Sequence, residues 1–101
     1  MIDPSEPSAS VLVVDDADDL RRLITIALHR AGFDVLEASS GEAALEIVES
    51  RSVDVIVLDM GLPVMSGTDV VRALRARPET MTLPVLLMTG SGTSHSVIEG
   101  T

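Results

Sequence analysis

Residues 10–32, with the sequence SVLVVDDADDLRRLITIALHRAG, decide the fold class of this chain. The apolar run at Ser10–Val14 is short and continuous, which is typical of a strand buried on both faces of a parallel sheet. Four acidic residues follow within Asp15–Asp19, and from Leu20 the apolar residues recur at helical spacing. Gly32 stands where a C-terminal cap is expected. The stretch therefore predicts a strand, an acidic turn and an amphipathic helix.

The same alternation continues along the chain. Helix starts are indicated by two capping-box patterns, Ser39 with Glu42 and Ser66 with Asp69. Strands are predicted at Phe33–Ala38, Val53–Leu58 and Leu83–Thr89, helices at about Glu42–Arg51 and Val70–Arg77, and a turn or two of helix at Ser94–Gly100. Alternating strands and helices predict an α/β fold with a doubly wound parallel sheet and helices on both faces. Residues 1–9 are expected to form a flexible leader, and residues 10–101 a single domain.

The composition of the chain excludes several kinds of binding partner and site. The chain has 101 residues, which suits one domain, and 16 acidic against 7 basic residues give a net charge of -9. This charge argues against direct binding to nucleic acid or to an anionic membrane, because phosphate binding needs clustered cations. The absence of cysteine excludes disulfides and thiolate metal sites. With neither a signal-peptide pattern nor an apolar stretch long enough to span a bilayer, a cytoplasmic location is expected.

Acidic residues follow two of the predicted strands. In an open α/β sheet, ligands bind beyond the carboxyl ends of the strands where the strand order reverses. In a flavodoxin-like order that point lies between the first and third strands, which are followed by Asp15, Asp16 and Asp59. Three converging carboxylates suit Mg²⁺, and a carboxylate beside Mg²⁺ can act as a nucleophile toward phosphorus. Thr89 and Gly90, at the end of the fourth strand, could bind phosphoryl oxygens.

Each acidic residue also has a purely structural interpretation. Asp16 could be a helix N-cap, Asp18 and Asp19 suit the positive end of a helix, and Asp59 could simply start a loop. The joint arrangement favours function, because these acids follow the two strands that the topology brings together. The two histidines have no metal-ligand spacing.

At these residues the sequence resembles the receiver domain of two-component response regulators. The matching segments are VLVVDD at 11–16, VDVIVLDMGLPVMSG at 53–67 and PVLLMTG at 84–90, and the likeness runs from about residue 10 to the end. The resemblance implies a flavodoxin-like fold. It also implies a phosphoacceptor domain rather than an enzyme, one that at most catalyses its own phosphorylation and dephosphorylation.

The resemblance also implies a role for each matching residue. Asp59 would accept a phosphoryl group from a sensor histidine kinase or a phosphotransfer protein. Mg²⁺ would be bound by Asp16, Asp59 and the backbone carbonyl of Gly61, with Asp15 helping through water. Thr89 would be the switch hydroxyl, and Gly90 and Met60 would bind phosphoryl oxygens.

The sequence departs from the family pattern after the fourth strand. Receiver domains usually carry about twenty more residues, with a fifth strand that supplies a lysine for the phosphoryl group. All seven basic residues here are arginines. We therefore expect a strand order of 2-1-3-4 with the fifth βα unit missing, and slow phosphorylation. The fourth strand would then be an unpaired edge, and we expect the chain to be either self-associated or only marginally folded.

Two other functions are weighed against the phosphoacceptor. A phosphorylation-impaired receiver could serve as a protein-interaction or self-association module. A phosphatase with an aspartate nucleophile would need an acid two residues after Asp59, where Gly61 stands, and this option carries little weight. The sequence does not name the kinase, the signal or the output.

Overall fold

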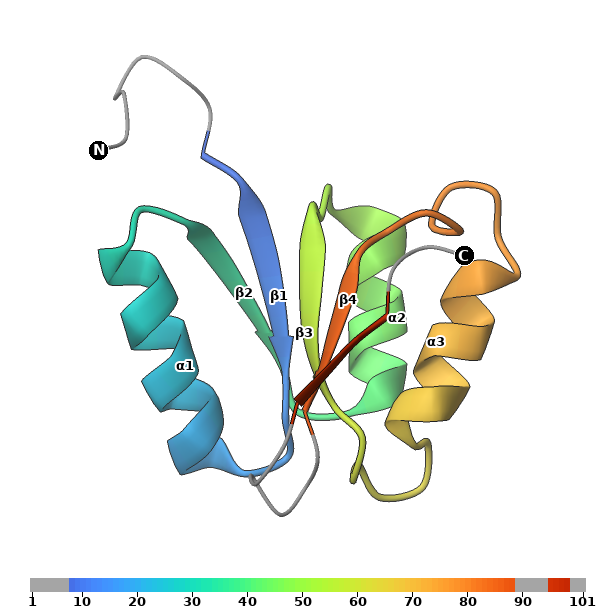
Figure 1. Cartoon of the computed structure of the whole chain (residues 1–101), viewed down its shortest axis with the longest axis horizontal. Helices are drawn as coiled ribbons and strands as arrows, with labels where there is room; N and C mark the ends of the chain where they lie inside the picture. Colours follow the sequence, from blue (N-terminus) through green and yellow to red (C-terminus); the bar gives the residue numbers. More distant parts are fainter. Residues whose placement is uncertain (1–7, 89–94, 99–101) are drawn as a thin grey trace.

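The computed structural model describes residues 8–88 and 95–98, which form a central sheet flanked by helices. The strands are β1 (Ser10–Val14), β2 (Asp34–Ala38), β3 (Val55–Asp59), β4 (Val85–Met88) and β5 (His95–Ile98). The helices are α1 (Asp18–Arg30), α2 (Gly41–Ser50) and α3 (Gly67–Arg75). The strands follow one another across the sheet in the order β2-β1-β3-β4-β5 (Figure 1).

The first four strands are parallel, and their order confirms the sequence prediction of 2-1-3-4. β1 pairs with β2 on one side and with β3 on the other, and β3 pairs with β4. The register places Val14 beside Leu58, at the carboxyl ends of β1 and β3. The reversal of strand order therefore lies between β1 and β3, as a flavodoxin-like sheet requires.

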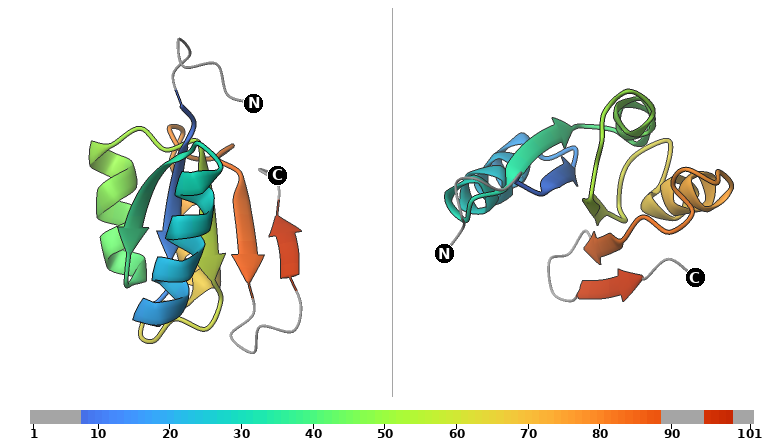
Figure 2. Two further views of the ribbon diagram at one scale, coloured as in Figure 1. Left: turned by 90° about the vertical axis from the view of Figure 1, so that its left-hand side faces the viewer. Right: turned by 90° about the horizontal axis from the view of Figure 1, so that it is seen from above.

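Helices cover both faces of the sheet, α1 on one side and α2 with α3 on the other (Figure 2). Alternate strand residues supply the two layers: Leu12 and Ile56 belong to the core beneath α2 and α3, whereas Val13 and Val57 pack with residues of α1. Each fully buried Leu or Ile contributes about 2 kcal/mol through the hydrophobic effect. This two-sided burial explains why the strands are almost continuously apolar.

The helix boundaries follow local signals. Ser66 caps α3 through the predicted capping box with Asp69, and Gly32 follows α1 with a φ of 99°. The predicted cap of α2 is wrong by one residue. Ser40 rather than Ser39 occupies the N-cap, and its hydroxyl accepts a hydrogen bond from the backbone N–H of Ala43. Each of the two capping serines fixes where its helix begins beside the carboxyl ends of the strands.

The segment after β4 differs from expectation. His95–Ile98 is a strand that pairs antiparallel with β4, so the helix predicted over Ser94–Gly100 is wrong for these residues. β4 is consequently not the unpaired edge that the sequence predicted, because its outer side is hydrogen-bonded to β5. Among the described residues, a parallel fifth strand with its own helix is absent. Self-association of the chain stays a prediction, for which light scattering is the test.

Over residues 8–88 and 95–98, the structure contains no helix with the length and apolar character needed to cross a membrane.

Candidate functional site

Three carboxylates meet where β1 and β3 end. Asp15 follows β1 directly, Asp59 is the last residue of β3, and Asp16 is adjacent in the chain. One carboxylate oxygen from each of the three residues lies within 4.8 Å of the others. The sequence-based expectation that these side chains converge is therefore met by the geometry. We call Asp15, Asp16 and Asp59 the acidic cluster.

Asp15 is the most buried member of the acidic cluster, with only 2% of its surface exposed. Burial raises the pKa of Asp15 above its usual value, and the negative charges of Asp59 and Asp16 raise it further. A hydrogen bond of 2.9 Å from the backbone N–H of Ala17 to Asp15 Oδ1 acts in the opposite direction. A cation bound beside the ionised Asp15 carboxylate would offset both the cost of burying its charge and its repulsion by Asp59 and Asp16.

Asp59 is also buried, and a loop fixes its carboxylate. The backbone N–H of Gly61 donates to Asp59 Oδ1 at 2.9 Å. The backbone N–H of Met60 donates instead to the carbonyl of Met88 at 2.8 Å, continuing the ladder between β3 and β4. The backbone N–H of Met60 is expected to bind a phosphoryl oxygen. To do so, it would have to give up its hydrogen bond to the carbonyl of Met88. The loop therefore fixes one carboxylate oxygen of Asp59 by a hydrogen bond, and the carboxylates of Asp15 and Asp16 lie close to Asp59.

Asp16 is exposed at the rim of the acidic cluster. It does not cap α1, because the N-cap position is Ala17, which makes no side-chain cap hydrogen bond. The structural interpretation weighed for Asp16 therefore fails, and its carboxylate lies with those of Asp15 and Asp59 instead. Two other expected site residues, Thr89 and Gly90, lie outside the described residues.

The acidic cluster suits a hard divalent cation. Its ligand atoms are all carboxylate oxygens, which Mg²⁺ and Ca²⁺ prefer, and two of the three carboxylates, those of Asp15 and Asp59, are buried next to like charges. Such a group is costly to keep ionised without a counter-charge. The donor set and the burial of Asp15 thus fit Mg²⁺, with the backbone around Gly61 at the same edge of the sheet.

Sequence reasoning missed Arg21, whose side chain reaches the acidic cluster from α1. Its guanidinium donates to the backbone carbonyl of Asp15 at 2.9 Å and to Glu37 on β2 at 3.0 Å. The only signal in the sequence is an arginine one turn into the helix that follows the acidic turn. Glu37 gives no signal at all, because its partner is distant in the chain.

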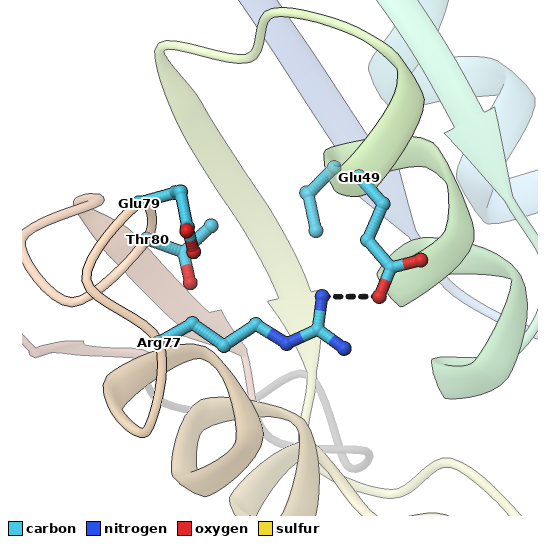
Figure 3. A pocket seen from close by; sticks show the side chains of 5 residues that line it. Glu49, Arg77, Glu79 and Thr80 are labelled. Atoms are coloured by element: carbon cyan, nitrogen blue, oxygen red, sulfur yellow. Dashed lines mark ion pairs between the residues drawn. The ribbon is translucent and has the colours of Figure 1, made fainter.

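A separate polar pocket of about 300 Å³ lies between the end of α2 and the segment that follows α3 (Figure 3). Glu49, Arg77, Glu79 and Thr80 line it, and Arg77 and Glu49 form an ion pair across it. α2 and α3 end at the edge of the sheet opposite the acidic cluster. The pocket is therefore not part of the candidate site.

Comparison with known proteins agrees with this geometry. Residues 11–101 match the family model described as the response regulator receiver domain. The phosphate regulon transcriptional regulatory protein PhoB of Pseudomonas aeruginosa is 34% identical over 91 residues, which are 90% of this chain and 40% of that protein. The transcriptional regulatory protein SrrA of Staphylococcus aureus is 37% identical over 93 residues, covering 92% and 37% respectively. The chain thus spans about two fifths of the length of these relatives.

Solved structures show the same likeness. The chemotaxis response regulator CheY4 of Vibrio cholerae superposes with a TM-score of 0.81 at 35% identity, covering 87% of this chain and 72% of that one. The signal receiver domain of a signal transduction histidine kinase from Syntrophus aciditrophicus gives a TM-score of 0.78 at 26% identity, with coverage of 81% and 62%.

Proposed function

The chain belongs to the family of response regulator receiver domains, and from this premise we propose that it accepts a phosphoryl group on Asp59 in a Mg²⁺-dependent reaction. The observation that carries the proposal is the convergence of Asp15, Asp16 and Asp59 within 4.8 Å at the carboxyl ends of β1 and β3. The donor would be the phosphohistidine of a sensor kinase or phosphotransfer protein on the cytoplasmic side. A receiver domain of a histidine kinase among the structural relatives supports this class of partner.

In the proposed step, a carboxylate oxygen of Asp59 forms a bond to phosphorus. The bond between phosphorus and the donor's imidazole nitrogen breaks at the same centre, and the nitrogen keeps the electron pair. The product is an acyl phosphate on Asp59. The hydrogen bond from Gly61 N–H to Asp59 Oδ1 fixes the plane of the attacking carboxylate, which reduces the entropy lost on reaching the transition state.

The remaining members of the acidic cluster would hold the cation. Asp16, Asp59 and the Gly61 carbonyl would bind Mg²⁺, with Asp15 assisting through water. Mg²⁺, when bound, supplies a positive charge that offsets the charge on the transferring phosphoryl group. Gly90 and Met60 would donate backbone N–H groups to phosphoryl oxygens, Met60 after leaving Met88, and Thr89 would supply a hydroxyl.

Intact-mass spectrometry tests this proposal. The chain is incubated with Mg²⁺ and acetyl phosphate, beside Asp59→Asn and the control Asp19→Asn, which removes an acid from the first turn of α1. We expect the parent and Asp19→Asn to gain one phosphoryl mass, and Asp59→Asn and an EDTA-treated parent to gain none. Because the 101 residues hold no lysine, uptake would also show that the chemistry needs none from this chain. Uptake by Asp59→Asn would identify a different acceptor.

A further inference from the structure

Arg21 joins three elements at the edge of the sheet that carries the acidic cluster. All three guanidinium nitrogens donate: Nη1 to the carbonyl of Asp15 at 2.9 Å, Nε to Glu37 Oε1 at 3.0 Å and Nη2 to Asp18 Oδ1 at 2.7 Å. Only 12% of its side chain is exposed. Arg21 is thus a mostly covered arginine whose three nitrogens each donate to a different partner: Asp15 just after β1, Asp18 in α1 and Glu37 in β2. Three such bonds hold its side chain more firmly than the single contact of an exposed ion pair would.

Asp15 is the residue that this arrangement fixes. Its carbonyl accepts from Arg21, its Oδ1 accepts from the N–H of Ala17, and its own N–H donates to the carbonyl of Ala38 at 3.1 Å. The backbone of Asp15 is therefore held on both sides, and its carboxylate is tied to the turn that leads into α1. The direction of this turn also sets where Asp16 lies.

We propose that Arg21 is a positioning residue for the acidic cluster: by binding the carbonyl of Asp15, it holds the turn so that the carboxylates of Asp15 and Asp16 converge on Asp59 before a cation binds. The inference rests on the proposed function, because it assigns a role toward the proposed Mg²⁺ site. Asp18 and Glu37 balance the guanidinium charge. Arg21 thus acts through geometry rather than as a free counter-charge to the acidic cluster.

The two conceivable effects of Arg21 on Mg²⁺ binding have opposite signs. If Arg21 acted only by its charge, its removal would strengthen binding, because a positive group near a cation site repels the cation. If Arg21 positions the turn, its removal weakens binding, because the carboxylates must then be ordered when Mg²⁺ arrives. The sign of the change in Kd therefore separates positioning from electrostatics.

Arg22 provides a matched control on the same helix. Its Nε lies 3.8 Å from the other carboxylate oxygen of Glu37, and its side chain is exposed. Replacing Arg22 removes the same charge without removing a hydrogen bond to Asp15. The variants to compare are Arg21→Ala, Arg21→Lys and Arg22→Ala in the 101-residue chain, with Mg²⁺ as the titrant in isothermal titration calorimetry. Titrations are run well below each variant's Tm.

We expect Arg21→Ala to raise the Kd for Mg²⁺ by about tenfold, as is typical when a residue that supports a metal ligand is removed. Arg21→Lys should recover part of the affinity, because an ammonium can still donate to the Asp15 carbonyl but cannot serve three acceptors from one plane. Arg22→Ala should stay within about twofold of the parent, since exposed charges contribute little. An Arg21→Ala chain that binds Mg²⁺ as tightly as the parent, or more tightly, would overturn the inference.

Separate controls test whether a variant folds and whether the proposed function itself is correct. Should Arg21→Ala not fold, Arg21→Lys decides: a Kd above that of Arg22→Ala supports positioning, and an equal Kd overturns it. A parent that binds Mg²⁺ and is phosphorylated, with all Arg21 variants unchanged, overturns this inference alone. A parent that binds no Mg²⁺ overturns the proposed metal site together with this inference, so the two failures are distinguishable.

Discussion

Val64 carries backbone strain in the loop that follows the candidate phosphoacceptor. Its φ is 65°, in the left-handed region, and the N–H of Met65 donates to the carbonyl of Pro63 at 2.7 Å across it. This is a γ-turn centred on a β-branched residue, and such turns are rare and strained. The side chain of Val64 is 96% exposed, so no packing offsets the strain. The loop between Asp59 and Ser66 is therefore held in place by its neighbours rather than by local preference.

Val64→Asn is expected to stabilise the chain by about 1 kcal/mol, because asparagine tolerates the left-handed region and a β-branched residue there costs about 1–2 kcal/mol. Denaturant unfolding followed by circular dichroism measures the change. Val64→Ala removes the β-branch but has no polar side chain that could hydrogen-bond to the local backbone, so it should gain less. Equal stability of the parent and Val64→Asn would mean that the γ-turn is not strained.

At the scale of elements, Gly67 lets α3 begin against the end of β3. A Cβ on Gly67 would lie 2.7 Å from Met60 Cα and 2.9 Å from the carbonyl oxygen of Asp59. Both are backbone atoms, so they can move only with the loop. At Gly41, the corresponding start of α2, a Cβ would instead meet the side chains of Val70 at 2.8 Å and Met65 at 3.0 Å.

Gly67→Ala is therefore expected to destabilise the chain by about 2–3 kcal/mol through overpacking, and to weaken Mg²⁺ binding because the loop beside Asp59 must shift. Gly41→Ala is the matched control; we expect a smaller loss of stability and an unchanged Kd for Mg²⁺. Thermal unfolding and calorimetric titration report the two quantities. The interpretation fails if both alanine variants behave alike.

Elements with strong local signals were predicted well from the sequence. The apolar run at Ser10–Val14 and the capping box of Ser66 with Asp69 specify their strand and helix by themselves. The carboxylates at the carboxyl ends of β1 and β3 could be placed together because the topology rule needs only the strand order. The strand at His95–Ile98 could not be predicted, because these four residues form a strand by pairing with β4, and no local sequence pattern indicates that pairing. The contacts of Arg21 escaped notice for the same reason, since Glu37 comes from another strand.

At the scale of the whole molecule, the pH dependence of stability reflects the buried acid. Burial and repulsion raise the pKa of Asp15 above its usual 3.8. The folded chain then binds this proton more tightly than the unfolded chain, so the stability that Asp15 contributes is greatest at low pH and is lost as pH rises from 3.8 through the raised pKa. Without a cation, ionised Asp15 therefore works against folding at neutral pH.

Mg²⁺ should reverse this trend, because it binds the ionised carboxylates of the folded state. At ten times its Kd, a ligand of the folded state adds about 1.4 kcal/mol and raises Tm by roughly 5–10 °C in a domain of this size. We expect the difference in Tm between Mg²⁺ and EDTA to be small near pH 4 and to grow as Asp15 ionises.

NaCl is used to match ionic strength, because screening of the net charge of -9 also stabilises the chain. Asp15→Asn should raise the Tm in EDTA at neutral pH and shrink the Mg²⁺ effect. Asp19→Asn, which only removes an acid from the first turn of α1, should not raise the Tm in EDTA and should leave the Mg²⁺ effect at full size. A Mg²⁺ effect that is independent of pH, or that survives in Asp15→Asn at full size, would show that the cation binds elsewhere on the acidic surface.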